Sequence, residues 1–251
     1  MAAEEGRGSN PNNAQVRRPE MLCPESGKLY IFGYGSLIWK PNITYSRSWI
    51  GYIKGYKRRF YQGTTTHRGT PQQASEPGRV LTLLPSSDKE QRVWGKLFEV
   101  DGVDEINAAI EHLAEREMIL GGYRFDVVPF YPFKNCENNN YEQSPEVIQS
   151  IVYIAEPGND QYIGKAPLEV QARQIAIAHG FCGPNSEYLK KLIEFIIEEV
   201  PKDNLHHDKY SLDLWNLVNE YLQQIASSTS QEMNNSSEIL TPLIVSSIVS
   251  N

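Results

Sequence analysis

Segments that favour strands come before segments that favour helices in this chain, and this order constrains the fold most. The strand-like segments are short runs rich in β-branched and aromatic residues, and most are separated by Gly, Pro, Asn or Asp. They cover residues 29–32, 56–61, 79–84, 93–100, 124–129 and 147–155. Because strands and helices do not alternate regularly, we expect an α+β fold with a mixed or antiparallel sheet.

Three helices are expected in the second half of the chain. Residues 167–179 form the first, with Gly180 as its stop signal, and residues 185–200 form the second, capped by Asn185 or Ser186. The third begins at a Ser211 cap and runs through Leu222. The ends of the chain have polar compositions with little to bury, so we expect a disordered segment over 1–27, one folded domain over 28–225 and a flexible tail over 226–251.

Charge and composition exclude several classes of function. The 251 residues carry a net charge of −7 without a long basic run, which argues against a nucleic-acid partner. The longest late apolar stretch, residues 239–249, is about half of the ~20 residues that a membrane span needs, so no membrane association is expected. Three widely spaced cysteines and the lack of an apolar N-terminal run predict a cytosolic protein without disulfides. A small soluble ligand fits best.

Glu117 is an acidic residue on the apolar side of an expected helix over 103–120. The apolar stripe of this helix consists of Ile106, Ile110 and Leu113. At ~100° per residue, Glu117 lies within about 40° of this stripe, whereas Glu115 and Glu111 point roughly 160° and 120° away from Glu117, toward solvent. A carboxylate that faces a core needs partners or takes up a proton with a raised pKa, and the C-terminal end of the helix dipole raises that pKa further. Glu117 is therefore a candidate general base; the alternative is a helix-end glutamate that extends to water.

A glycine-rich turn follows the first strand, at residues 33–39. Gly33 and Gly35 flank Tyr34 and permit a tight turn with close approach of a ligand to the backbone. The successive amides of Gly35, Ser36 and Leu37 can form a concavity for a carboxylate or an oxyanion. The alternative is a plain glycine-rich strand end. Neither a third glycine nor a Gly-Lys-Ser/Thr sequence follows, so the turn matches no nucleotide-binding pattern.

Two arginines are candidates for pairing with a substrate carboxylate. Arg68 lies in a long polar loop and Arg79 begins the strand that follows it. For each of the two, the equally weighted alternative is a structural role in which the arginine braces the loop. The sequence His206-His207-Asp208 offers too few ligands at defined spacing for a metal site, and Cys182 lacks an ionising environment, so no metal and no nucleophilic cysteine are expected.

Six segments occur together in an order that resembles the ChaC family, over roughly residues 29–223. They are Gly-Tyr-Gly-Ser-Leu-Ile-Trp at 33–39, His-Arg-Gly at 67–69, Pro-Gly-Arg-Val at 77–80, Val-Trp-Gly at 93–95, Arg-Glu at 116–117 with Gly-Gly-Tyr at 121–123, and Asn-Ser-Glu-Tyr-Leu at 185–189. Many members have Asp before His-Arg-Gly, where this chain has Thr66, which puts any role of an acid at that position in doubt.

The resemblance implies a γ-glutamylcyclotransferase-like fold, a small mixed β-barrel flanked by helices. It also implies that residues Gly33 to Ile38 cradle the γ-glutamyl group of glutathione, that Glu117 is the catalytic glutamate, and that Tyr188 lines the pocket. Arg79 completes the set of expected substrate-binding residues: Gly33, Tyr34, Gly35, Ser36, Leu37, Ile38, Arg79 and Tyr188.

The implied reaction is an intramolecular cyclisation of the γ-glutamyl group that gives 5-oxoproline and cysteinylglycine. It requires no cofactor, because nucleophile and electrophile belong to one molecule. Two alternatives stay open at this point. One is a cyclotransferase for other γ-glutamyl amino acids or amines, and the other is a non-catalytic protein that uses the same pocket to bind or regulate a partner.

Overall fold

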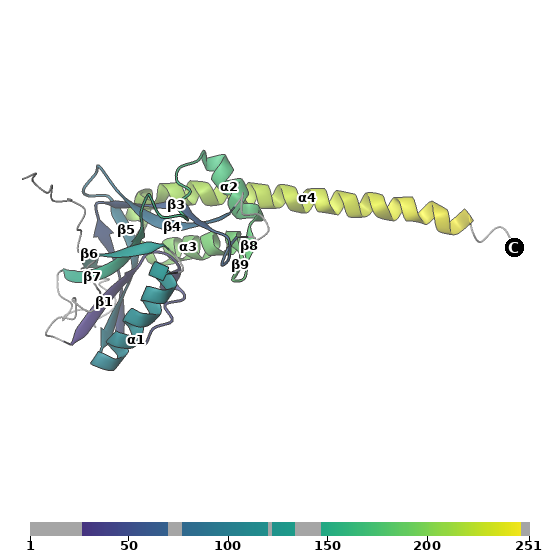
Figure 1. The fold of residues 1–251 in the computed structure, drawn as a ribbon. Coiled ribbons are helices and arrows are strands. Elements are labelled where there is room, and N and C mark those ends of the chain that lie inside the picture. The colour runs from purple at the N-terminus through teal and green to yellow at the C-terminus, as the bar shows by residue number, and fades with distance from the viewer. Residues whose placement is uncertain (1–26, 70–76, 120–121, 134–146, 247–251) are drawn as a thin grey trace, which may run out of the picture.

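The computed structural model describes residues 27–69, 77–119, 122–133 and 147–246, with side chains as far as Thr229. The expectation of disorder over 1–27 therefore lies, except for Gly27, outside the described residues. The strands occupy the first part of the described chain and the long helices the last part, as the order of segments predicts (Figure 1).

Five strands close into a barrel in the order β1-β5-β2-β6-β7. Their bounds are Lys28–Gly33 for β1, Arg47–Lys54 for β2, Arg92–Asp101 for β5, Tyr123–Pro132 for β6 and Ile148–Ala155 for β7. Neighbouring strands are antiparallel except β1 and β7, which pair in parallel with Ile31 opposite Ile151. The expected small mixed β-barrel is confirmed.

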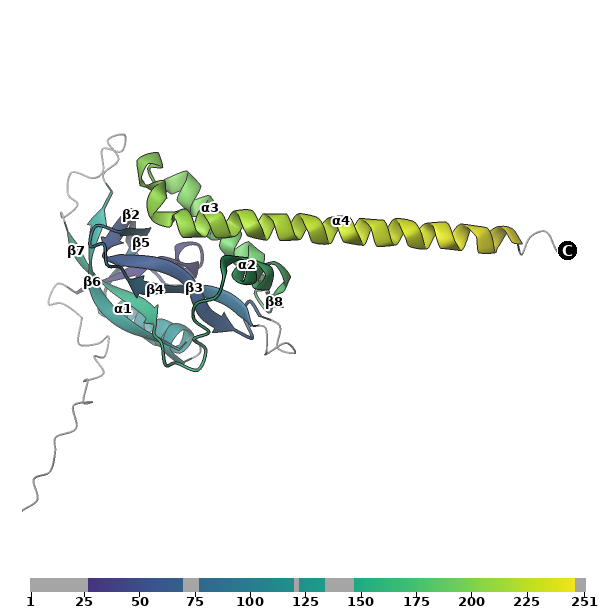
Figure 2. The same ribbon diagram turned by 90° about the horizontal axis from the view of Figure 1, so that it is seen from above.

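A two-stranded ribbon of β3 (Tyr56–Thr64) and β4 (Gly78–Pro85) packs beside the barrel. It lies between the barrel and the helices α2 (Leu168–Ile177), α3 (Asn185–Glu199) and α4 (Lys209–Ser246) (Figure 2). The ribbon is antiparallel, and its register shifts between Arg59 and Gln62. Its inner residues therefore connect the barrel core with the helical layer.

Strand β2 has no counterpart among the expected strands. Only Gly51 and Ile53 of its eight residues are buried, although residues 49–53 contain Trp, Ile and Tyr, which favour strands. Its strand conformation comes from pairing with β5 and β6 on its two sides. At Gly51 a Cβ atom would lie 2.3 Å from the Tyr131 carbonyl oxygen, so only glycine allows this close approach of the strands.

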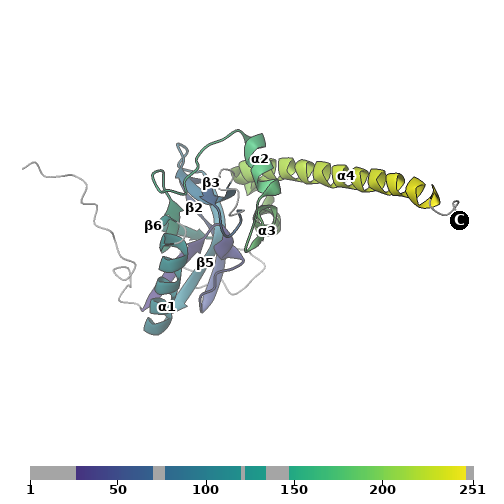
Figure 3. The ribbon, with the colours of Figure 1, turned by 45° about the vertical axis from the view of Figure 1, so that its right-hand side comes forward.

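The expected helix over 103–120 divides into two parts. An α-helix, α1, covers Val103–Leu113, and a π-helical turn, η4, covers Ala114–Ile119. Within α1, Ile106, Ile110 and Leu113 are buried against strands of the barrel, which confirms the apolar stripe. Figure 3 shows α1 on one side of the barrel, with α2 and α3 on the other.

The expected helix boundaries need three corrections. Helix α2 ends at Ile177, because residues 179–180 form β8 of a small hairpin with β9 at residues 183–184. Asn185 does not cap α3; its amide bridges the backbone of Arg79 instead, accepting from the nitrogen at 2.7 Å and donating to the oxygen at 2.8 Å. Ser211 lies buried inside α4, because a 3₁₀ helix, η6 (Lys202–Asp208), leads directly into that helix.

Helix α4 continues to Ser246 and projects from the body of the molecule (Figure 1). It thus runs through most of the segment expected as a tail over 226–251. No Gly or Pro occurs between Lys202 and Thr241, so nothing in that stretch stops a helix. Among described residues, no helix has the length and apolar content required to cross a bilayer. The flexibility of the tail stays a prediction.

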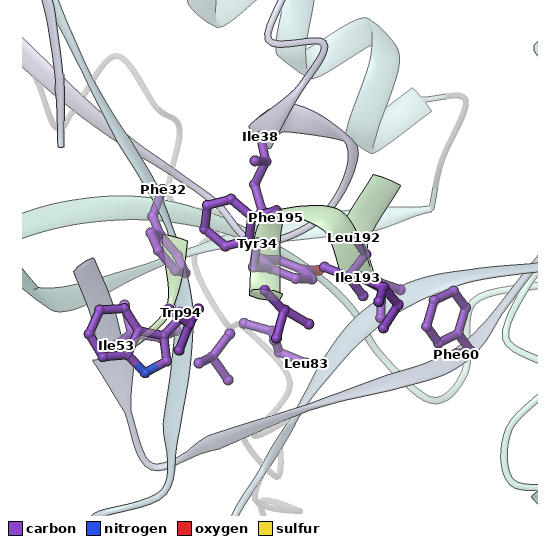
Figure 4. Close-up of a cluster of buried hydrophobic side chains, with 14 of the residues drawn as sticks. Phe32, Tyr34, Ile38, Ile53, Phe60, Leu83, Trp94, Leu192, Ile193 and Phe195 are labelled. Carbon is purple, nitrogen blue, oxygen red and sulfur yellow. The ribbon is translucent and has the colours of Figure 1, made fainter. Parts of the chain in front are cut away.

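The larger hydrophobic core joins the barrel, the β3–β4 ribbon and the helices α2 to α4. Figure 4 shows Leu192 and Ile193 of α3 among strand residues that include Phe60 and Leu83. A helix that presents apolar residues on one face in this way is held by tertiary packing.

Arg58 of β3 lies fully inside the protein and joins three segments. Its Nε donates to the Tyr34 carbonyl at 3.0 Å, its Nη1 forms a 2.5 Å ion pair with Asp208 Oδ1, and its Nη2 donates to the Trp94 carbonyl. The side chains of Arg58 and Asp208 are 1% and 3% exposed. This buried ion pair therefore ties η6 and β5 to the turn that follows β1.

Replacing Asp208 by alanine should lower the free energy of unfolding by about 3–5 kcal/mol, because it leaves the buried charge of Arg58 without its partner. Asp213→Ala is the matched control in the same region, since Asp213 pairs with Lys209 at 2.7 Å on the exposed surface of α4 and should cost at most ~1 kcal/mol. Urea denaturation of both variants measures the difference. Equal losses would show that the buried pair does not hold the helical layer to the barrel.

Candidate active site

A cavity that is partly open to solvent lies where the turn after β1 meets the end of α1. Nine residues line it: Tyr34, Gly35, Ser36, Leu37, Leu81, Glu117, Tyr123, Tyr153 and Tyr188. They come from the turn, from η4 and from β4, β6, β7 and α3. The cavity thus brings together segments that lie far apart in the sequence.

The glycine-rich turn forms one wall of this cavity. Residues Ser36–Ile38 make a short 3₁₀ helix, η2, in which the Ile38 amide donates to the Gly35 carbonyl at 2.9 Å. A Cβ at Gly35 would lie 2.7 Å from the Tyr188 hydroxyl. Glycine is needed here because the backbone and that tyrosine approach so closely.

Glu117 lines the cavity from the opposite side, on η4. Its side chain is 15% exposed, whereas Glu115 on the same turn is an exposed residue. Burial raises the pKa of Glu117, and the charge of Arg116, whose Nε lies 2.9 Å from Glu117 Oε1, acts in the opposite direction. The net pKa stays above its ordinary value. A carboxyl group with a raised pKa can both take up and return a proton near neutral pH.

Four tyrosines surround this carboxyl group, and burial raises the pKa of each. Tyr34 donates to the Tyr153 carbonyl at 2.7 Å, and Tyr123 donates to the Leu81 carbonyl at 2.5 Å. The pKa of Tyr188 is about 12, because burial outweighs the effect of backbone hydrogen bonds from Leu81 and Ser36. These phenols therefore stay neutral near pH 7, and of the nine lining residues only Glu117 has a side chain that titrates at lower pH.

Most of the predicted substrate-binding residues lie at the cavity. Tyr34, Gly35, Ser36, Leu37 and Tyr188 line it, together with the predicted base. Gly33 and Ile38 flank the turn without being part of the lining, and both are buried.

Arg79 lies outside the cavity lining and is buried. Its guanidinium donates to the Phe60 and Gly164 carbonyls at 2.9 and 3.1 Å and to Gln174 Oε1 at 2.5 Å. These contacts fit the alternative reading of an arginine that braces the surrounding segments.

Arg68 is engaged in a similar way. Its Nη1 donates to the Pro184 carbonyl at 2.9 Å and pairs with Glu187 at 2.8 Å, so it joins its loop to the start of α3. It too lies outside the cavity lining, where the loop-bracing alternative again fits.

Three lining residues were not singled out as site residues from the sequence. The sequence indicates Tyr123 only as part of the Gly-Gly-Tyr segment. It indicates Leu81 and Tyr153 only as parts of expected strands. A tyrosine within the apolar run of β7 is the signal that would have indicated Tyr153, because a buried phenol needs a polar partner. For Leu81 no such signal exists, since an apolar residue in a strand is ordinary core.

The sequence His206-His207-Asp208 has a structural role through Asp208, which forms the buried ion pair with Arg58. In the described ranges of the chain, no three His, Cys, Asp or Glu side chains gather in a way that would hold a metal ion.

Comparison with known proteins identifies the class and then the family. A crystal structure of the selenomethionine-labelled yeast γ-glutamyl cyclotransferase specific to glutathione matches with a TM-score of 0.67 and 27% identity, over 78% of this chain and 97% of that chain. The fold is therefore of the γ-glutamylcyclotransferase type. The family model of ChaC-like proteins matches residues 29–221, and the chain belongs to the ChaC family.

Two curated relatives illustrate the degree of similarity. The Mus musculus glutathione-specific γ-glutamylcyclotransferase 1 is 40% identical over 201 residues, which cover 78% of this chain and 84% of the relative. The Saccharomyces cerevisiae glutathione-specific γ-glutamylcyclotransferase is 30% identical over 237 residues, which cover 80% of this chain and all of the relative.

Gly35→Ala should destabilise the protein by about 1–3 kcal/mol, because the new methyl group would overlap the Tyr188 hydroxyl. On a Tyr188→Phe background, which lacks this hydroxyl, the same change should cost less. Urea unfolding of the parent, both single variants and the double variant gives the coupling. An identical cost on both backgrounds would mean that the hydroxyl does not impose glycine at this position.

Proposed function

We propose that this protein cleaves glutathione by cyclising its γ-glutamyl group, which releases 5-oxoproline and cysteinylglycine. The observation that carries the proposal is that Glu117 and the glycine-rich turn line one cavity. Membership of the ChaC family and the glutathione-specific cyclotransferase names of the relatives support this substrate.

The proposed reaction needs one base that becomes an acid. Glu117 takes a proton from the α-ammonium of the γ-glutamyl group, and the free amine attacks the γ-amide carbonyl carbon. The attacking nitrogen of the tetrahedral intermediate gives up a second proton as the amide C–N bond breaks, and Glu117 transfers both protons in turn to the departing nitrogen, so that cysteinylglycine leaves with a protonated amine. Protons and bonds balance within one substrate molecule, so the scheme uses neither water nor a cofactor. The cavity contributes by holding the amine near its own carbonyl, which supplies effective molarity.

The turn is proposed to hold a negatively charged oxygen of the substrate, either the α-carboxylate or the oxyanion of the intermediate. The first amides of a helix lack intrahelical partners, so those at the start of η2 can donate to such an oxygen. A backbone hydrogen bond from Ser36 reaches the Tyr188 hydroxyl, so a bound oxygen shares that amide with the tyrosine or displaces it. This contact supports Tyr188 as a member of the proposed substrate-binding set, together with Tyr34, which lines the same cavity.

Glutathione, rather than another γ-glutamyl compound, is the finer part of this proposal. We expect the protein to act in the cytosol, where thiols are kept reduced. A competition assay that offers glutathione together with γ-glutamyl amino acids and γ-glutamylamines tests the preference. Preferential release of 5-oxoproline from one of the competitors would overturn the substrate assignment. Release from no compound, glutathione included, would favour a non-catalytic binding protein.

Glu117→Gln should keep the fold and lower kcat by about 10²–10⁴-fold, because it removes the proton acceptor while preserving the shape of the side chain. Glu115→Gln is the control two residues away on the same turn, and it should be nearly silent because Glu115 is exposed. Cysteinylglycine release from glutathione measures both. Parent turnover in Glu117→Gln, or a large loss in Glu115→Gln, would contradict the assignment of the base.

Activity should fall as the pH is lowered through the raised pKa of Glu117, because only the ionised carboxylate accepts a proton. The acidic limb of the kcat/KM profile should therefore have its midpoint above 4.5, the ordinary value for this group. The residual activity of Glu117→Gln should lack this limb. A limb that persists in that variant would belong to another group.

A further inference from the structure

Arg116 and Glu117 are consecutive residues whose side chains meet directly. Adjacent residues of an α-helix point about 100° apart and do not face each other. Here, on the π-helical turn η4, the two long side chains nevertheless meet, and Arg116 Nε lies 2.9 Å from Glu117 Oε1. Among the described residues, Arg116 is the only ion-pair or hydrogen-bond partner of this carboxylate.

The remaining nitrogens of the same guanidinium reach across to the glycine-rich turn. Nη2 donates to Ser36 Oγ at 2.8 Å, and Nη1 donates to the Lys40 carbonyl at 2.7 Å. All three nitrogens of Arg116 are thus used, one on the carboxylate and two on the segment that carries the opposite wall of the cavity. Such a planar set of donors fixes direction as well as distance.

Apolar packing does little to hold this part of the chain. The turn Ala114–Ile119 contains no buried residue, Met118 is half-buried, and Ile119 is 76% exposed. Upstream, α1 is anchored by its buried stripe, but that stripe ends at Leu113. The position of Glu117 relative to η2 therefore depends on polar contacts.

We infer that Arg116 is a positioning residue of the active site, which holds the Glu117 carboxylate at a fixed place opposite the glycine-rich turn through its contacts with Ser36 and Lys40. The inference rests on the proposed function, because it gives Arg116 the role of holding the proposed base in place. It makes Arg116 act through Glu117 and not on the substrate itself.

The charges around Glu117 allow a test that distinguishes positioning of the base by Arg116 from a merely structural role of this arginine. Arg116 is the cation that opposes the effect of burial on the pKa of Glu117. The other titratable groups near this carboxylate are phenols from four further segments, Tyr34, Tyr123, Tyr153 and Tyr188, and the Glu117 charge raises the pKa of each. Beyond the guanidinium, His67 also interacts with the charges of Arg116, Lys40 and Arg68. Without the charge of Arg116, that cation no longer opposes the effect of burial on the pKa of Glu117.

Two substitutions separate position from charge. Arg116→Gln should lower kcat by about 10–100-fold, with little change in KM, and should move the acidic limb of the pH profile to higher pH. Arg116→Lys keeps the charge but offers one nitrogen, which cannot make three separate contacts, so kcat should fall while the acidic limb stays near that of the parent. Arg124→Gln is the matched control, because Arg124 pairs with Glu156 at 2.6 Å on the exposed surface of the barrel and should leave both quantities unchanged.

A second readout needs no turnover. The pKa of Glu117, followed by NMR of a carboxyl-labelled sample without substrate, should be higher in Arg116→Gln than in the parent, with Glu117→Gln identifying the signal. An unchanged pKa together with unchanged kcat would overturn the inference while leaving the proposed function intact. A rise in KM at constant kcat would also overturn it, because Arg116 would then bind substrate.

If the parent releases no 5-oxoproline but the pKa shift is present, the proposed function fails and the pairing of Arg116 with Glu117 stands. Should Arg116→Gln fail to fold, Arg116→Lys carries the test of position alone.

Discussion

The buried guanidinium of Arg58 is the interaction on which the arrangement of the site depends. A charge that is removed from water is costly unless every donor finds a partner, so the segments that supply those partners must all be in place together. They are the turn after β1, strand β5 and the 3₁₀ helix η6, through Tyr34, Trp94 and Asp208. The wall of the cavity, the barrel and the helical layer are therefore coupled through one side chain.

Around the cavity, burial determines the chemistry more than any single contact. The four tyrosines give Glu117 a surrounding of low polarity that contains no fixed negative charge, since their hydroxyls stay protonated. The hydrogen bonds that Tyr34 and Tyr123 donate to backbone carbonyls keep these two phenols in place without making them acidic. A carboxyl group in such surroundings exchanges its proton more easily at neutral pH than one in water.

The features that could be predicted from the sequence are those with a local cause. Strands with continuous apolar runs, such as β1 and β5, and the apolar stripe of α1 follow from periodicity, and the placement of Glu117 followed from that stripe. Strand β2 was missed although Trp49, Ile50 and Tyr52 favour a strand; the glycine within this run weakens the signal, and pairing with β5 and β6 on both sides completes the strand. The same holds for Asn185, which has the composition of a helix cap but binds the backbone of Arg79 instead. The π-helical turn η4 could not be predicted either, since a helical wheel assumes α-helical geometry throughout, and the pairing of Arg116 with Glu117 depends on side-chain conformations that the wheel does not describe.

The parallel pairing of β1 with β7 has a kinetic consequence. Ile31 meets Ile151, and the hydroxyl of Tyr34 bonds the carbonyl of Tyr153, so the cavity wall is completed by contacts of large sequence separation. Forming such contacts costs the entropy of closing a long loop before the contacts contribute any stability, so they form late and slowly. The residues of β1 and β7 that complete the cavity wall therefore come together only when the barrel closes.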